Sequence, residues 1–158
     1  MQSVLLLLEE GHPSSLIDQK GTKKITNKLG VGYNEVFCKS AAEMVSAVES
    51  YKRRVSTIII GNAALVMDNA QAAGTTPVLS YSSKPVKMGA LGGFVADDEK
   101  LGYMLAESVV DIMKNGKAVK DVPVKVDPNP KFYINAKSAE KIGIKVPYHI
   151  LEAATVIN

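Results

Sequence analysis

The sequence predicts an α/β protein: a doubly wound, mainly parallel five-stranded sheet with helices on both faces, plus a C-terminal strand–helix appendage. Two observations support this fold class. Five apolar, strand-like segments alternate with helical patterns over residues 1–116, which is typical of a parallel sheet. The predicted helices also end at glycine, the residue favoured in the left-handed position after a helix, namely at Gly30, Gly74, Gly116 and Gly143.

The most informative segment is Thr57 to Asn62, which contains three consecutive isoleucines. An uninterrupted β-branched run of this kind is typical of a central strand that is buried on both faces of a parallel sheet. Gly61 and Asn62 end the strand. Because ligands of open α/β sheets bind beyond the carboxyl ends of the strands, we expect these two residues near any binding site.

The elements before this strand are predicted from local patterns. Residues 4–8 form a buried strand, and a polar turn leads to a helix in which Leu16, Ile17, Ile25 and Leu29 provide the apolar positions, with a dent at Gly21. Residues 33–38 form a strand of mixed polarity, which favours a place near the sheet edge. Ser40 then begins a helix through a capping box with Glu43.

The elements after it complete the sheet. A helix runs to Gly74, and the next segments are a strand at 76–81, a loop with one helical turn at 82–89, and a strand at 90–96. Asp97 caps a long helix, with two further carboxylates in its first turn.

We therefore expect residues 1–116 to form an α/β ligand-binding lobe. Residues 117–158 are expected to form a connector and a tail, with a strand at 132–134, a short helix capped by Asn135, and amphipathic turns from Pro147 to Ile157.

Composition excludes several classes of function. The net charge is only +3 and the lysines are scattered, so nucleic acid is not an expected partner. The single cysteine, Cys38, excludes an internal disulfide and a cysteine-rich zinc site, and is best read as a small buried hydrophobe. The longest apolar run, residues 4–8, is far too short to span a membrane. No signal peptide accompanies this run.

The strand-to-helix turns should meet at one edge of the sheet because crossovers in such sheets are right-handed. These turns are small and rich in hydroxyl and amide groups. Ser14 or Ser15 lies at a helix N-terminus, where unpaired N–H groups favour a carboxylate or another anion. Each residue by itself is equally well explained as a helix cap or a turn former, but together they favour a site that hydrogen-bonds small polar groups.

No catalytic or cofactor motif is present. The two histidines, His12 and His149, lie in unrelated contexts, and no metalloprotease, nucleophile-elbow or phosphate-binding glycine motif occurs. We therefore expect no catalytic residue, no cofactor and no metal. A phospho-acceptor receiver domain also has five βα units, and it requires an aspartate where the third strand ends. This chain has Gly61-Asn62 there, and Asp68 lies within the next helix. The receiver interpretation therefore fails at its essential residue.

The chain resembles bacterial ABC-transporter substrate-binding proteins, in particular the tryptophan/tyrosine-type group. The segment from Tyr133 to Pro147 is similar to the closing motif INxKxAxxxGIxxP of this family. Weaker similarity covers the strings TPVLSY at 76–81, VKMGA at 86–90 and LGYMLA at 101–106, NGK at 115–117 leading to VPV at 122–124, and residues 4–15 and 55–69.

The resemblance implies one lobe of a two-lobed, periplasmic-binding-protein-like clamshell, with the N-terminal lobe absent. It also implies that the ligand-facing residues are His12, Ser14, Ser15, Gly61, Asn62, Ser80, Tyr81 and Asp97. The family's Asn-Ser pair in the first turn is replaced here by Ser14-Ser15, and its third-strand aspartate is replaced around Asn62. Ligand identity is therefore not carried over.

The expected function is non-enzymatic binding of a small, amino-acid-like solute for delivery to the permease of an ABC importer. The full-length protein is expected to be periplasmic or anchored by lipid outside the cytoplasm, and this chain to be a piece of a longer precursor. The alternative is a sensing lobe of a membrane-anchored signalling protein, and an enzyme is the third hypothesis. The tail, residues 127–158, is expected either to form a homodimer or to fold back on its own sheet, because its apolar residues lack the other lobe.

Overall fold

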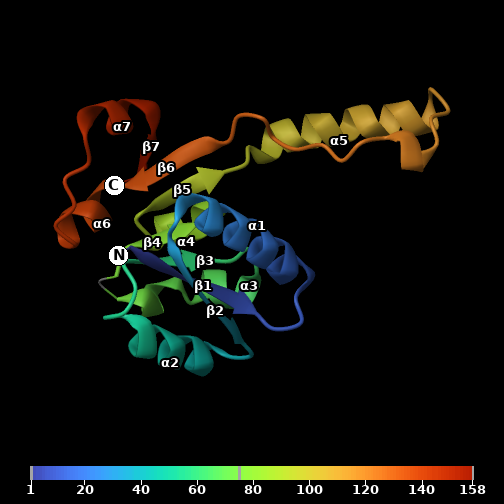
Figure 1. The fold of residues 1–158 in the computed structure, drawn as a ribbon. Helices are drawn as coiled ribbons and strands as arrows, with labels where there is room; N and C mark the ends of the chain where they lie inside the picture. Colours follow the sequence, from blue (N-terminus) through green and yellow to red (C-terminus); the bar gives the residue numbers. More distant parts are fainter. Residues whose placement is uncertain (1, 75, 158) are drawn as a thin grey trace.

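A computed structural model describes residues 2–74 and 76–157, and these residues form one seven-stranded sheet flanked by helices (Figure 1). The strands are β1 (Ser3–Glu9), β2 (Gly32–Cys38), β3 (Thr57–Ile60), β4 (Val78–Ser80), β5 (Gly92–Val95), β6 (Lys131–Asn135) and β7 (Thr155–Ile157). The helices are α1 (Pro13–Leu29), α2 (Ala41–Tyr51), α3 (Ala64–Asp68), α4 (Ser83–Lys87), α5 (Asp98–Met113), α6 (Ala136–Lys141) and α7 (Tyr148–Ala153). Two short 3₁₀ helices are η1 (Ala70–Ala73) and η2 (Val119–Asp121).

The strand order is β2-β1-β3-β4-β5-β6-β7, and the first five strands are parallel. The predicted fold class is therefore confirmed, and β2 lies at the sheet edge as expected. The predicted strand count was wrong. The tail is not an appendage, because β6 pairs antiparallel with β5 and β7 pairs parallel with β6. The final strand was missed because its three residues were included in the amphipathic turns predicted from Pro147 to Ile157.

One face of the sheet carries most of the core. Leu5, Leu7, Ile58 and Ile60 have no exposed surface, and they pack with side chains from α2, α3 and α4. This burial on a parallel sheet explains why β1 and β3 read as continuous apolar runs. Helix α1 covers the opposite face over β1 and β2.

Helix α1 packs differently from the sequence-based expectation. The helix runs unbroken through Gly21, so the predicted dent is absent. Its buried residues are the small hydroxyl-bearing Ser15, Thr22 and Thr26, whereas its large apolar residues are more than half exposed, namely Leu16, Ile17, Ile25 and Leu29. The threonine hydroxyls donate back to carbonyl groups of the helix, which lets them lie against an apolar sheet with their polar atoms satisfied.

Glycines fix two kinds of geometry. All four glycines predicted to end helices have positive φ, namely Gly30, Gly74, Gly116 and Gly143, but Gly74, with φ 63° and ψ −123°, is not in the left-handed helical conformation that was expected. The helix predicted to reach Gly74 is interrupted, because α3 ends at Asp68 and the 3₁₀ helix η1 follows. Gly93 serves another purpose, since a Cβ there would lie 1.8 Å from the carbonyl oxygen of Ser80, so its absence lets β4 and β5 approach.

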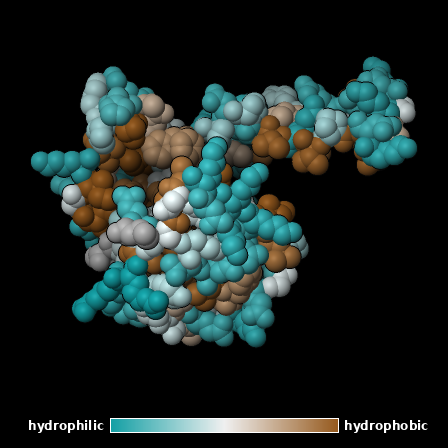
Figure 2. Space-filling view, viewed as in Figure 1, coloured by the Kyte–Doolittle hydropathy of each residue, from teal (hydrophilic) through white to brown (hydrophobic). Residues whose placement is uncertain are grey.

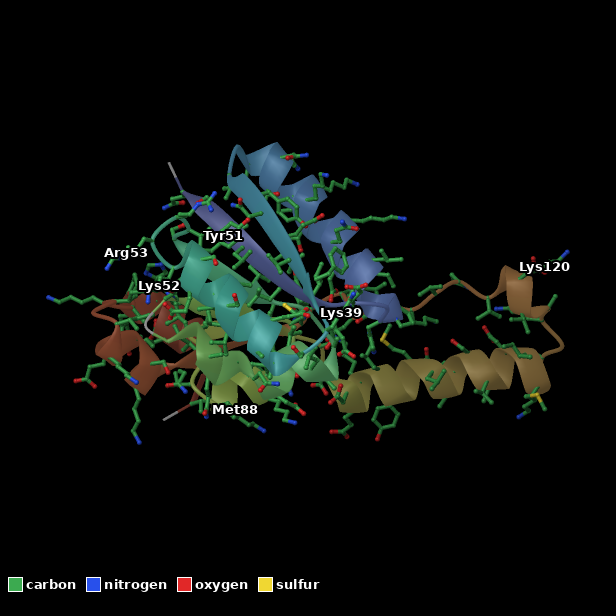
Figure 3. All side chains as sticks on the ribbon, turned by 90° about the horizontal axis from the view of Figure 1, so that it is seen from below. Lys39, Tyr51, Lys52, Arg53, Met88 and Lys120 are labelled. Atoms are coloured by element: carbon green, nitrogen blue, oxygen red, sulfur yellow. The ribbon has the colours of Figure 1, made fainter. Side chains whose placement is uncertain are left out.

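Helix α5 and the segment that returns from it, residues 114–130, project from the body as an arm (Figure 1). None of the residues of α5 is buried. Lys120 lies at the far end of this arm (Figure 3). Ion pairs fix its base: Lys131 to Asp97 at 2.6 Å and Lys100 to Asp127 at 2.6 Å. The predicted domain boundary after residue 116 remains a prediction.

Within the described part of the tail, β6 and β7 extend the sheet, while residues 127–130 belong to the segment that returns from the arm. Ile134 is buried, and Tyr133 and Ile157 pack against the core. Dimerisation through this tail remains a prediction. No helix in the described part of the chain is long and apolar enough to cross a membrane.

Candidate functional site

The turn between β1 and α1 brings His12 and Ser14 together at the carboxyl end of β1. His12 is the N-cap of α1, and its Nδ1 accepts the backbone N–H of Ser14 at 3.3 Å. The Ser14 hydroxyl lies 2.7 Å from the same nitrogen and 3.0 Å from the carbonyl oxygen of Asn62. This arrangement joins the turns after β1 and β3, as right-handed crossovers predict.

Asp18 ties the same two turns together from one helical turn further along α1. Its carboxylate accepts the backbone N–H of Asn62 at 2.7 Å. Gly61 makes this approach possible, because a Cβ there would lie 2.9 Å from both the carbonyl oxygen of Leu7 and a methyl group of Leu8. Burial raises the pKa of Asp18, and the Asn62 hydrogen bond and the nearby His12 oppose that shift.

Two of the predicted site residues point inward. Ser15 is 1% exposed, and its hydroxyl donates to the carbonyl oxygen of Glu9 at 2.7 Å. Ser80 is 3% exposed, and its hydroxyl accepts the N–H of Ser82 at 3.1 Å. Both hydroxyls therefore stabilise strand ends. The exposed part of the edge consists of the neighbouring residues instead.

Tyr81 follows β4 and is 40% exposed. Its hydroxyl lies 2.8 Å from the hydroxyl of Thr22 in α1, and burial raises its pKa. Its ring lines a groove of about 560 Å³ beside α1 that is mostly apolar, and Asp18 lies at the same groove. Tyr81 thus connects the polar turns with an apolar surface on the α1 side of the sheet.

Asp97 does not join this cluster through any contact that the structure describes. It caps α5, pairs with Lys131, and its N–H donates to the carboxylate of Asp127 at 3.1 Å. Lys131 lowers its pKa. The described contacts of Asp97 thus all belong to the base of the arm.

Three participating residues were not predicted from the sequence: Asp18, Thr22 and Glu9, whose carboxylate accepts the N–H of Leu65 at 3.0 Å. A signal for Asp18 was present, because it lies four residues after Ser14 and so on the same helix face. Among the described residues, no group of three or more histidine, cysteine, aspartate or glutamate side chains could hold a metal ion. The cluster can donate and accept hydrogen bonds, and Asp18 adds one partly buried carboxylate.

Comparisons with known proteins identify relatives of this chain. A family model described as ABC transporter substrate binding protein matches residues 1–157. A search of the curated proteins found no match.

Solved structures share the fold. A conserved domain protein from Vibrio cholerae superposes with a TM-score of 0.82 at 24% identity, over 99% of this chain and 55% of that chain. An ABC domain from Streptococcus pneumonia in complex with L-Trp superposes with a TM-score of 0.80 at 24% identity, over 99% of this chain and 56% of that chain. A ligand-free, open substrate-binding protein with adhesive properties from Clostridium difficile superposes with a TM-score of 0.78 at 21% identity, over 99% of this chain and 54% of that chain. The chain thus spans about half the length of these proteins.

Proposed function

Since this chain belongs to the family of ABC transporter substrate-binding proteins, we propose that it is one lobe of a non-enzymatic solute-binding protein. The observation that carries the proposal is the joined edge of β1 and β3. There, Ser14 and Asp18 hold the backbone of Asn62 from two sides, and the residue itself is exposed. A site made in this way is fixed before a ligand arrives, which lowers the entropy lost on binding.

The proposed ligand is a small amino-acid-like solute. Asp18 is a partly buried carboxylate with a raised pKa, so a ligand ammonium group would compensate its lost hydration. His12, Ser14 and the side chain of Asn62 provide polar partners for the rest of a polar ligand. The exposed part of the Tyr81 ring, beside these polar groups, would contact an apolar part of the solute.

The other residues that the resemblance implies as ligand-facing would support the site without contacting the solute. Gly61 permits the close approach of the turns, while Ser15 and Ser80 support the strand ends from inside. Asp97 would act at the base of the arm, where the chain passes between lobes. The second wall of the cleft would come from another lobe of a longer protein located outside the cytoplasm, and an ABC permease would receive the solute.

The test is a titration of the 158-residue chain with the common amino acids, followed by NMR chemical shifts. One lobe makes about half of the contacts with the ligand. The ligand still loses most of its translational and rotational freedom, which costs about 4 kcal/mol or more. Since ~1 μM binding corresponds to about −8 kcal/mol, millimolar or weaker binding is expected from one lobe. Shifts should concentrate at His12, Ser14 and Asn62.

Asn62→Ala should remove the shifts, and Asn115→Ala, which changes an exposed asparagine on the arm, should not. Saturable shifts confined to other regions would contradict the proposed site. Micromolar binding by a monomer would contradict the half-site argument. Turnover of a substrate that depends on His12 or Ser14 would refute the non-enzymatic assignment.

A sensing lobe of a signalling protein is the alternative function, and it would use the same edge. Gene context distinguishes the two: neighbouring permease and ATPase genes support import, whereas a fused kinase or cyclase domain supports sensing.

A further inference from the structure

The two faces of the sheet are covered unequally. A helix about 10 Å wide covers roughly two strands spaced 4.8 Å apart, so a five-stranded layer needs more than one helix on each face. Three helices cover the face of Ile58 and Ile60, but the described helix contacts with the other face come from α1, and these lie over β1 and β2. In the described part of the chain, the α1 face over β3, β4 and β5 therefore lacks a covering helix.

This open face is apolar. The strand register places one row of residues across it: Leu6, Ile59, Leu79, Gly92, Ile134 and Val156. Leu6 and Ile134 in this row are buried, but Leu79 is 36% exposed, Val156 is 41% exposed, and Phe94, two residues after Gly92, is 62% exposed. On the opposite face, Ile58 and Ile60 have no exposed surface. The α1 face is therefore apolar along the whole row but only partly covered, with exposed apolar residues on β4, β5 and β7.

The groove beside α1 lies at the border of this face. It has a volume of about 560 Å³, and its wall includes the exposed apolar residues of the helix, Ile17, Ile25 and Leu29, opposite Val4, Ile59 and Tyr81. Thus the apolar residues of α1 point into the space that a second helix would fill. Figure 2 shows apolar side chains exposed around this part of the body.

Helix α5 of the same chain also has an apolar surface that no other part of the described chain buries. Helix α5 has an exposed apolar stripe at i, i+4 and i+8, formed by Leu105, Val109 and Met113. Gly102 and Ala106 border this stripe and would allow close approach to another surface. The returning segment covers another side of α5, where Lys125 lies 3.7 Å from Glu107.

The charges of the two helices are complementary. Helix α1 carries four lysines and one aspartate, a net charge of +3, whereas α5 carries four acidic residues and one lysine, a net charge of −3. Opposite net charges favour approach of α5 to α1 and disfavour packing of two α5 helices against each other.

The α5 of the same chain is held away from the groove. Asp127 accepts hydrogen bonds from the side chain of Lys100 and from the backbone of Asp97 and Asn129, and Lys131 pairs with Asp97. These contacts fix the first turn of α5 in its projecting direction. A swing back onto α1 would break this network.

We propose that two copies of this chain exchange their α5 helices, so that the helix of each copy fills the α1 groove of the other. The relation is two-fold and closed, and each copy gives and receives the same surface. The matched solved chains, of which this chain covers 55–56%, have a little less than twice its length, so two copies would have nearly the size of one such protein. This inference does not depend on solute binding.

The test is the molar mass of the 158-residue chain in solution, measured by light scattering over a range of protein concentrations. The expected mass is about twice the 16.9 kDa of one chain. Val109→Asp in α5 and Ile25→Asp in the groove should each give a monomer. Val124→Asp, in the returning segment at a residue that is 92% exposed, is the matched control and should remain a dimer.

A mixture of the Val109→Asp and Ile25→Asp chains provides the decisive measurement. One of the two exchange contacts is intact in the mixed pair, so a heterodimer should form although neither chain dimerises alone. This rescue also shows that both variants are folded. A monomeric parent chain would overturn the proposal. So would an Ile25→Asp chain that still dimerises, since that would mean packing between α5 helices or through the tail.

Discussion

At the scale of single residues, the site edge depends on side chains that hold backbone groups. Asp18 and Ser14 both bind the backbone of Asn62, and His12 holds the N–H of Ser14. The sequence was sufficient to place these turns on one edge, because strand ends and right-handed crossovers follow from local patterns. It did not indicate that Ser15 and Ser80 point inward, because their direction depends on which carbonyl or amide lies nearest in three dimensions.

Gly61→Ala should destabilise the protein by about 1–3 kcal/mol, because the new methyl group would be forced against Leu7 and Leu8. Gly21→Ala is the matched control. It lies within α1 with nothing within 4 Å of its Cβ, so it should stabilise the protein by about 0.5–1 kcal/mol. Urea denaturation followed by circular dichroism measures both. Equal effects of the two substitutions would contradict the close approach at Gly61.

Asp18→Ala should lower the free energy of unfolding by about 1–3 kcal/mol, because it removes a charged acceptor from the N–H of Asn62. The measurement is again urea denaturation at neutral pH. Asp121→Ala on the arm is exposed and should change stability by less than about 0.5 kcal/mol. An Asp18→Ala chain as stable as its parent would mean that the turns hold together without this carboxylate.

At the scale of elements, α5 combines a regular helix with very little packing. Its cap, its acidic first turn and its periodicity predicted the helix correctly, because all three are local signals. That α5 projects from the body was not predictable, because amphipathic periodicity identifies the apolar face of a helix but not the surface that covers this face. The same reason explains α1, whose apolar residues fit the helical period and yet point away from the core.

The base of the arm should loosen in acid before the sheet does. Lys100 and two backbone N–H groups lower the pKa of Asp127 to about 2, and Lys131 lowers that of Asp97. A carboxylate with a folded-state pKa below its unfolded value of about 3.9 stabilises the fold above that value. Its contribution is lost as the pH falls through the folded-state pKa. Hydrogen exchange, corrected for its intrinsic pH dependence, should therefore lose protection in α5 between about pH 4 and pH 2.

Asp127→Asn is the matching variant for this acid transition. At neutral pH it should already show the fast exchange in α5 that the parent chain shows in acid, and its acid transition should be weaker. Loss of protection in β1 and α5 at the same pH would contradict an arm that opens independently.

At the scale of the whole molecule, the sequence predicted the class of fold, the position of β2 at the sheet edge and the position of β3 inside the sheet. Alternation of strands and helices is repeated along the chain, so one error in an element does not change the class. The added strands β6 and β7 were not assigned to the sheet, because β6 pairs with β5 through residues 36 to 42 positions apart and β7 pairs with β6 through residues 22 positions apart. Local periodicity contains no information about such pairing.

Cys38 provides a probe of global opening. It has no exposed surface, it is free, and burial raises the pKa of its thiol. Modification by a thiol reagent at pH 8 should therefore be slow in the native protein and immediate in denaturant, because the thiolate forms only when the core opens. Fast labelling of the folded chain would indicate that the end of β2 opens locally.

The arm is also a chain excursion that returns to its own starting point. It leaves at the end of β5 and comes back at the start of β6, and these two strands are antiparallel neighbours. In connectivity, residues 96–130 are therefore the loop of a very long β-hairpin. Replacing them with a four-residue turn shortens the loop by about three doublings, which should reduce its closure cost by about 2 kcal/mol. The shortened protein should fold as the same sheet and melt at a higher temperature than the parent monomer, with no means of exchanging a helix.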